Sequence, residues 1–393
     1  MKVLYLSYFA EPTTFEKICE AGLDPSVARQ NYDEALLKNL LSGEILPQED
    51  VEIVSYLPYN SQLGEVPLEE EYLGKKLSYV WTKRSNPFTI LKAMKRVKKL
   101  VNAWIKRTEG EERIILTYAA NPILLAPVIS KRKKVKFVTV CSEVPQYRNM
   151  TEGNKIVNGL KKKIFTHYNE KMSGYIYMSK FMDEVCNAHQ APWIVVEGMT
   201  SIPPLGEKFS KTEERIFYAG GLHKENGIDL LLDAVVQLNE KGRKLVLQLC
   251  GKGNEEERVA EYADKYEYIQ FFGSLPNQEV RALEKSATVL INPRKPDHML
   301  TKYSFPSKTF EYFSSGTAAL LTRLDGIPEE FYEYCYTCSV DSTEQLAQDI
   351  EAVLSVPLEE REAKAAQAYE FLVREKSAMA QTKRIVQFLK EVI

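Results

Sequence analysis

Short apolar runs that alternate with longer amphipathic segments restrict most strongly how this chain can fold. Runs of this kind are typical of strands buried on both faces, and segments with helical periodicity between them indicate βαβ units around a parallel sheet. Helical periodicity is clear at 32–41 and 90–105. In the first half the expected strands are 3–8, 51–56, 114–118, 137–141, 175–178 and 194–196.

The alternation stops at 198–214, where Pro203, Pro204 and Gly206 indicate a linker, and it then starts again. The expected strands of the second half are 216–219, 245–249, 269–272, 288–291, 318–322 and 336–340. The expected helices between them are 228–240, 255–266, 278–285, 308–315 and 343–354. A chain of 393 residues is long enough for two cores. The sequence therefore predicts an α/β protein with two Rossmann-like, doubly wound domains at 1–199 and 215–375. A linker at 200–214 joins them, and a C-terminal helix at 376–393 is available to pack back on the first domain.

Charge is distributed unevenly along the chain. Residues 1–200 carry 28 Lys plus Arg against 23 Asp plus Glu, whereas residues 201–393 carry 24 against 31. Two basic amphipathic segments, from Lys92 to Arg107 and from Lys155 to Lys163, contribute much of the positive excess. They fit either the solvated faces of core helices or peripheral contact with a membrane. No leader or spanning segment is evident, so we expect a cytoplasmic protein with no nucleic-acid partner, and peripheral membrane association is the alternative to a fully soluble one.

The six cysteines are scattered, which favours reduced thiols over a disulfide framework. The Cys335–Cys338 run has no second pair or histidine to complete a metal site, and no Asp-x-Asp motif is present. We therefore expect no metal and no cofactor.

Three glycine-containing loops follow successive strands of the second half. Gly220 and Gly221 follow the first strand, Gly251 and Gly253 the second, and Gly273 the third, shortly before Leu275. Glycine lets backbone approach a ligand closely, and amides at a helix start attract anions. Each loop alone is weak evidence, but the series predicts a nucleotide crevice at the carboxyl ends of these strands.

The most informative segment runs from Asn292 to Gly316 (NPR...KYSFPSKTFEYFSSG). Ser307 is expected to cap the helix that follows and Gly316 to end it, which leaves helix amides free to meet a diphosphate. Arg294, together with Lys302 or Lys308, supplies the matching positive charge. Glu311 lies one turn inside, where a carboxylate can accept both hydroxyls of a ribose; a solvent-facing glutamate is the alternative.

These segments resemble the family 4 retaining glycosyltransferases of GT-B fold, particularly the bacterial branch that builds capsular and exopolysaccharides. Support comes from YAGGLHKENGIDLLLDA, CGKGNEEE, FFGSLPNQE and CSEVPQY. The resemblance implies that Glu311 is the catalytic-site ribose ligand and that the backbone of Ser304, Phe305 and Ser307 meets the diphosphate. It places the base near Leu275.

The sequence departs from that family at three positions. The first of the family's paired glutamates falls at Tyr303, and the arginine and lysine of its first loop fall at Gly221 and Asn226. Arg294, Lys302, Lys308 or Lys224 are left as candidate substitutes.

In the first half, Glu143 follows an expected strand and is the candidate to orient an acceptor hydroxyl or to steady positive charge at the sugar; capping of the next segment is the alternative. The expected activity is metal-independent transfer of a hexose from a nucleotide-diphosphate sugar, with UDP the expected carrier, to a glycan or lipid-linked acceptor. A non-catalytic glycan-binding subunit and a nucleotide-sugar epimerase of the same fold remain alternatives.

Overall fold

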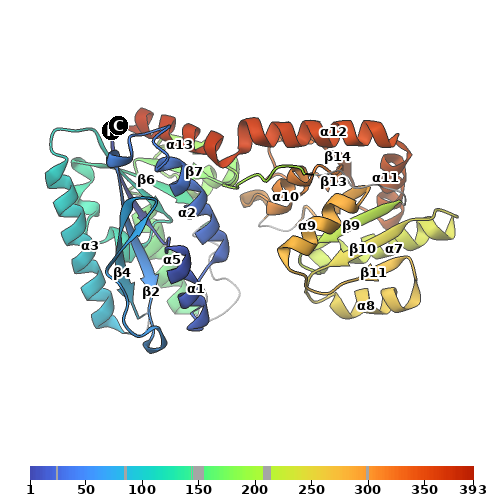
Figure 1. Cartoon of the computed structure of the whole chain (residues 1–393), viewed down its shortest axis with the longest axis horizontal. Helices are drawn as coiled ribbons and strands as arrows, with labels where there is room; N and C mark the ends of the chain where they lie inside the picture. Colours follow the sequence, from blue (N-terminus) through green and yellow to red (C-terminus); the bar gives the residue numbers. More distant parts are fainter. Residues whose placement is uncertain (24, 84–85, 143, 145–154, 207–213, 298–300) are drawn as a thin grey trace. The chain divides into compact units, whose positions relative to one another are not determined.

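The computed structural model of the chain describes residues 1–23, 25–83, 86–142, 144, 155–206, 214–297 and 301–393, with backbone alone at 155–158 and 161. The chain divides into two compact units (Figure 1). Unit 1 comprises Met1–Ser201 and Lys376–Ile393, and unit 2 comprises Ile202–Glu375. The candidate Glu143 lies outside the described residues.

Unit 1 is built on one sheet with the strand order β3-β4-β2-β1-β5-β6-β7-β8. All neighbours pair in parallel except β3 and β4, which are antiparallel. The strands are β1 Lys2–Ser7, β2 Val51–Pro58, β3 Glu69–Tyr72, β4 Lys75–Thr82, β5 Arg113–Tyr118, β6 Lys136–Cys141, β7 Gly174–Tyr177 and β8 Trp193–Val195.

Helices cover both faces of this sheet, and Figure 1 shows α2 and α3 on opposite sides of β2 and β4. The helices of unit 1 are α1 Pro12–Glu20, α2 Val27–Leu40, α3 Pro87–Arg107, α4 Pro122–Leu125, α5 Lys155–Asn169, α6 Asp183–Cys186 and α13 Ala378–Val392. The last helix, α13, packs on α2 and β8. Its attachment is polar as well as apolar, since buried Glu197 accepts hydrogen bonds from Lys376 Nζ (2.8 Å) and Gln381 Nε2 (2.9 Å).

Unit 2 contains a second sheet, with the order β11-β10-β9-β12-β13-β14 and every pairing parallel. Its strands are β9 Arg215–Ala219, β10 Val246–Cys250, β11 Ile269–Phe271, β12 Val289–Asn292, β13 Ala319–Thr322 and β14 Tyr336–Cys338. Its helices are α7 Ile228–Glu240, α8 Glu256–Lys265, α9 Asn277–Ser286, α10 Ser307–Ser315, α11 Thr343–Ser355 and α12 Leu358–Phe371.

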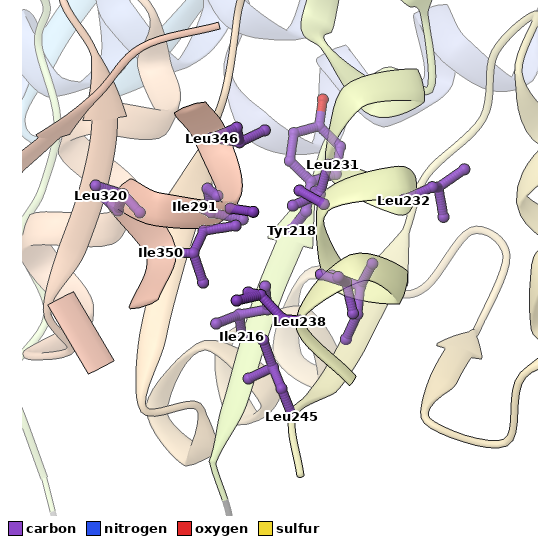
Figure 2. Packing of buried hydrophobic residues seen from close by; sticks show 14 of the residues in the cluster. Ile216, Tyr218, Leu231, Leu232, Leu238, Leu245, Ile291, Leu320, Leu346 and Ile350 are labelled. Carbon is purple, nitrogen blue, oxygen red and sulfur yellow. The ribbon is translucent and has the colours of Figure 1, made fainter. Parts of the chain in front are cut away.

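Strand β9 shows why apolar runs without polar alternation form this sheet. Ile216 and Tyr218 point into a core with α7 and α11, which Figure 2 shows around Leu231, Ile350 and their neighbours. Phe217 and Ala219 point into a second core with α9, α10 and α12. Successive side chains of a strand alternate between faces, so a sheet covered on both faces needs apolar residues at every position.

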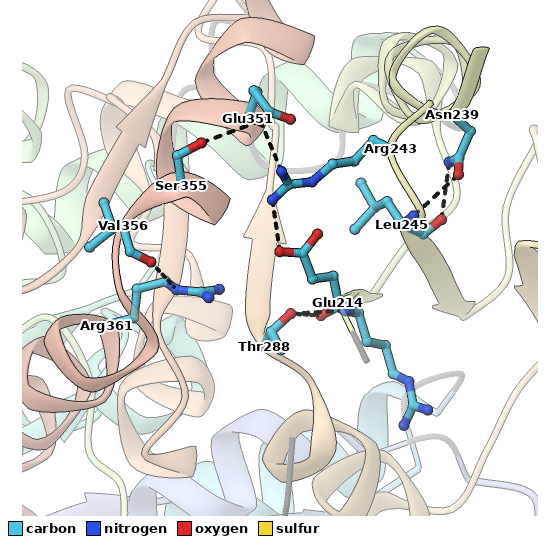
Figure 3. A network of polar contacts seen from close by, with 10 residues as sticks. Glu214, Asn239, Arg243, Leu245, Thr288, Glu351, Ser355, Val356 and Arg361 are labelled. Atoms are coloured by element: carbon cyan, nitrogen blue, oxygen red, sulfur yellow. Dashed lines mark hydrogen bonds and ion pairs between the residues drawn. The ribbon is translucent and has the colours of Figure 1, made fainter. Parts of the chain in front are cut away.

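A polar network lies at the amino ends of these strands, opposite the glycine loops (Figure 3). Arg243 donates to Glu214 just before β9 (2.7 Å) and to Glu351 on α11 (3.1 Å). Asn239 Nδ2 donates to the carbonyl of Leu245 (3.0 Å), which fixes the turn between α7 and β10.

Each strand expected from the sequence corresponds to a strand of the structure, with end shifts of one or two residues. The β3–β4 hairpin is a correction, because no strand was expected between 57 and 113 and β4 pairs with β2 along most of its length. Its sequence KKLSYVWT begins with two lysines and lacks the continuous apolar run of its neighbours.

Candidate functional site

The three glycine loops of unit 2 meet at the carboxyl edge of its sheet. The Gly220 amide donates to the carbonyl of Cys250 (3.0 Å), and the Gly251 amide donates to the carbonyl of Gly273 (2.8 Å). A Cβ on Gly251 would lie 1.8 Å from Gly220 O, and one on Gly253 would lie 2.0 Å from Leu222 O. Gly251 and Gly253 thus let these loops lie backbone against backbone.

The first loop is closed by its own side chains. The carbonyl oxygen of Gly221 accepts hydrogen bonds from the Tyr218 hydroxyl (2.9 Å) and from Asn226 Nδ2 (2.7 Å). Gly221 and Asn226 are the positions at which the resembled family carries a cation pair. Here the Asn226 side chain donates to the Gly221 carbonyl instead, so these two positions supply no cation to the first loop.

Arg294, which follows β12, is the cation that stands out at this edge. It is half-buried, and within the described part of the chain its guanidinium makes no hydrogen bond and no ion pair. Desolvation lowers its pKa, while the nearby Tyr218 and Glu225 raise it. The next residue, Lys295, is instead paired with Asp229 at 3.1 Å. A desolvated guanidinium without a partner is costly for a folded protein unless a ligand supplies the anion.

Helix α10 begins beside these loops without a side-chain cap. Its N-cap is Pro306, which makes no side-chain hydrogen bond to the helix amides. The expectation that Ser307 caps the helix is therefore wrong: Ser307 is the first helical residue and is exposed. Gly316 ends the helix in the left-handed conformation (φ 73°), as expected. The uncapped start leaves amides available to an anion, a favourable position for one because of the helix dipole.

Lys308 and Glu311 form an ion pair on the first turns of α10. Both lie near the glycine loops, since Lys308 lowers and Glu311 raises the pKa of the buried Cys250 thiol at the end of β10, although burial is the larger cause there. Tyr312 anchors the helix above the sheet by donating to the carbonyl of Ile291 on β12 (3.0 Å). The carboxylate of Glu311 retains acceptor capacity beyond this pair, because two oxygens offer about four lone-pair sites.

Glu284 on α9 is a residue of this site that the sequence did not reveal. It is 2% exposed, and its Oε1 is buried with no hydrogen-bond partner among the described residues. Burial raises its pKa to about 7, with a lowering contribution from Lys308 and a raising one from Glu311. The pattern of the helix NQEVRALEKS predicts that this glutamate faces solvent. Its burial becomes apparent only from the packing of α9 against α10.

The remaining predicted positions surround this core of the site. Lys302 lies beside the ring of Tyr303 (5.8 Å), in a short helical turn before α10. The ring of Phe305 packs on Phe310 (4.9 Å) and Leu275 also packs on that core, so their side chains hold the loops in place. Ser304 O lies against Gly326, where a Cβ would approach within 2.1 Å. Lys224 is exposed in the first loop.

All six cysteines are free, and burial raises the pKa of Cys335 and of Cys338 to about 12, which keeps both as thiols. The described residues contain no cluster of three or more His, Cys, Asp or Glu side chains suited to a metal ion. In the same part of the chain, no helix has the length and apolar character that crossing a bilayer requires.

A known protein family covers the part of the chain that contains these loops. Residues 206–371, which contain every loop of the site, match the family model described as glycosyl transferases group 1. The chain contains a glycosyltransferase domain. No curated protein sequence matches this glycosyltransferase significantly.

Solved structures share the architecture of both units. The apo structure of OtsA matches with a TM-score of 0.65 at 9% identity, over 100% of both chains. A structure titled as trehalose-6-phosphate from E. coli bound with UDP-2-fluoro glucose gives 0.64 at 9% identity over the same shares. A UDP-forming trehalose-phosphate synthase from Burkholderia xenovorans gives 0.61 at 11%, over 100% and 99%. The expected fold, GT-B with two parallel-sheet domains, is thereby confirmed.

Proposed function

We propose that this glycosyltransferase transfers a hexose with retention from a UDP-sugar to a glycan or lipid-linked acceptor in the synthesis of cell-surface polysaccharide. The observation that carries the donor part is the half-buried Arg294, which has no hydrogen bond or ion pair with any described residue, in the same unit as the uncapped start of α10. Helix amides and a guanidinium together suit a diphosphate, and Glu311 suits a ribose. Assignment to family 4 and to its polysaccharide-building branch rests on the segment from Asn292 to Gly316.

In this mechanism the protein supplies positioning and charge stabilisation. The bond from the sugar's anomeric carbon to the diphosphate breaks while the acceptor oxygen approaches on the same face. The acceptor proton passes to the departing phosphate oxygen. The α10 amides, Arg294 and Lys308 neutralise the charge that grows on the diphosphate, the largest electrostatic demand of the step. Because these fixed cations face the leaving group, we propose that transfer needs no metal.

UDP is the proposed carrier because structural neighbours are described as binding a UDP-sugar or as UDP-forming. A thermal-shift panel of UDP, GDP, ADP and CMP tests this choice. A ligand present at a hundred times its Kd stabilises a folded protein by ~2.7 kcal/mol, which corresponds to about 5 °C or more for a unit of this size. A larger shift with another nucleotide would change the carrier. If none of the four shifts the melting temperature, the donor assignment fails and a glycan-binding subunit becomes the better interpretation.

The role of Glu311 has a sharper test, because a ribose ligand discriminates between UDP and 2′-deoxy-UDP. Each hydrogen bond to a carboxylate contributes about 1.5–3 kcal/mol, so the wild-type protein should prefer UDP by ten-fold or more. Glu311→Ala should remove that preference. Glu257→Ala, at an exposed position on α8, is the matched control and should keep it. A folded Glu311→Ala variant that still distinguishes the two nucleotides would contradict the assignment.

We also propose a cytoplasmic location with peripheral membrane contact through the basic segments on α3 and α5. On α3, Phe88 is 80% and Leu91 is 55% exposed, next to Lys92. On α5, Leu160 and Ile164 are also exposed. Exposed apolar side chains among lysines are typical of helices that lie on anionic lipid. Co-sedimentation with anionic vesicles should fall in a Phe88→Ser/Leu91→Ser variant, and equal sedimentation of wild type with neutral vesicles would refute the electrostatic part.

A further inference from the structure

Unit 1 contains a pocket of about 170 Å³ at the carboxyl ends of β1 and β2. Tyr8 and Tyr56 form part of its wall, Phe15 and Leu57 supply an apolar side, and Arg29 on the first turn of α2 supplies a positive charge. Its volume corresponds to about five or six water molecules, enough for a charged group with part of a sugar ring. The sequence did not single out any of these residues.

The guanidinium of Arg29 lies over two aromatic rings. Its guanidinium carbon is 4.2 Å from the centroid of Tyr8 and 5.3 Å from that of Tyr118. Among the described residues, its buried Nε has no hydrogen-bond partner and its guanidinium makes no ion pair. Cation–π contacts restrict the orientation of a guanidinium and leave its N–H groups free to donate to a phosphate or carboxylate.

The nearest carboxyl group does not cancel this charge. Asp33, one turn further along α2, is buried and accepts hydrogen bonds from the Tyr5 hydroxyl and from the Tyr8 amide (3.1 Å). Burial raises the pKa of Asp33 to about 7, against the lowering effects of those hydrogen bonds and of Arg29. Asp33 is therefore only partly ionised near neutral pH and is committed to the loop after β1.

Arg29 reaches the part of the sheet edge where ligands of this fold class bind. Tyr8 directly follows β1, and Tyr118 is the last residue of β5. These two strands are neighbours in the sheet, and the chain continues from β1 toward β2 but from β5 toward β6, on the other side. The strand order therefore reverses between them, and in open α/β sheets the crevice at such a reversal is the usual ligand site.

We propose that this pocket is an anion-binding subsite in which Arg29 holds a phosphate or carboxylate group of the sugar acceptor. The apolar side formed by Phe15 and Leu57 would contact carbon atoms next to the charged group. This inference rests on the proposed function for the acceptor role, whereas the anion-binding property depends only on unit 1. It narrows the acceptors to anionic ones: phosphorylated sugars, phosphate-linked carriers or uronic acids.

The test is a set of calorimetric titrations of the full chain with glucose 6-phosphate, glucuronate and glucose. At least one of the two anionic sugars should bind ten-fold or more tightly than glucose, and the tighter of the two identifies the group that the pocket prefers. Arg29→Gln should remove the difference, and Arg29→Lys should restore part of it, because charge is kept and the planar fork is lost. Arg107→Gln, at an exposed arginine that pairs with Glu52, should leave all three affinities unchanged.

UDP titrated into the same variants separates this inference from the proposed function. Unchanged UDP affinity in Arg29→Gln, with a normal melting temperature, shows that unit 2 and the fold are intact. Equal binding of glucose and both anionic sugars by the wild type, or a preference that survives Arg29→Gln, would overturn the inference. If anionic sugars bind but no nucleotide does, the assignment to an acceptor is overturned and the proposed function fails with it.

Discussion

Replacing Arg294 by glutamine separates a ligand-binding cation from a structural one. In the described part of the chain the Arg294 guanidinium has no hydrogen bond or ion pair to lose, and desolvation lowers its pKa. Removing such a charge should leave the free energy of unfolding within ~0.5 kcal/mol of wild type, or slightly above it. Its effect should appear only when a diphosphate is present.

The expected binding loss follows from the kind of contact removed. One charge-assisted hydrogen bond contributes about 1.5–3 kcal/mol, which weakens UDP binding by about ten- to 150-fold. Uridine lacks the diphosphate, so its affinity for Arg294→Gln should equal its affinity for wild type. Calorimetry with UDP and uridine, together with chemical denaturation without ligand, gives all the required quantities.

Arg243 provides the matched control, because it is an arginine of the same unit with partners. It pairs with Glu214 and Glu351 on a part-buried surface (Figure 3). Arg243→Gln should lower the free energy of unfolding by ~0.5–1 kcal/mol and leave UDP affinity unchanged. If Arg294→Gln instead destabilises the free protein as Arg243→Gln does, with an unchanged ratio of UDP to uridine affinity, the reasoning about Arg294 is refuted.

Two further predictions concern the frame of the site. Gly251→Ala should lower the free energy of unfolding by at least ~1–3 kcal/mol, because its Cβ would lie 1.8 Å from Gly220 O at φ 144°. Gly242→Ala, which also has a positive φ but nothing within 4 Å of the added Cβ, should lower it less. Equal losses in chemical denaturation would contradict the close approach at Gly251. For Glu284, the folded-state pKa of about 7 lies above the ordinary 4.5, so its stabilising contribution is complete below about 4.5 and is lost as pH rises to about 7. Between pH 4.5 and pH 8 the free energy of unfolding of Glu284→Gln should therefore rise by up to ~3 kcal/mol relative to that of wild type. A difference that does not depend on pH would contradict the raised pKa.

The parts of the fold that could be predicted are those in which local pattern and tertiary role coincide. The strand at 215–219 is apolar at nearly every position because both faces of its sheet are covered, so the pattern alone locates it. The hairpin of β3 and β4 was not predicted, because β3 begins with Glu69–Glu71 and β4 begins with Lys75–Lys76, and such charged runs are typical of solvated loops. Its pairing with β2 is a long-range contact that no local pattern encodes.

The site divides in the same way. The glycine loops follow strands as expected, because turn residues are local signals, and α10 begins at Ser307, one residue before the expected helix. Glu284 and Arg29 were missed, since a charged residue on a helix normally faces solvent. Their burial depends on elements far away in the chain: α10 for Glu284, and the ends of β1 and β5 for Arg29. Sequence spacing carries no information about either contact.

The absence of the resembled family's cation pair from the first loop is best understood through the hydrogen bonds that replace it. Asn226 and Tyr218 both donate to the carbonyl of Gly221, so that loop is fixed by neutral contacts. Arg294, one strand over, lies close enough to Tyr218 that each alters the pKa of the other. A positive charge thus reaches the same edge of the sheet from β12 rather than from β9. A diphosphate responds to the local potential, whichever strand supplies the cation. Restoring an arginine at Gly221 would therefore add a second cation next to Arg294, and its Cβ would meet the ring of His223 at 2.8 Å, so the lost family residue is not expected to improve donor binding in this chain.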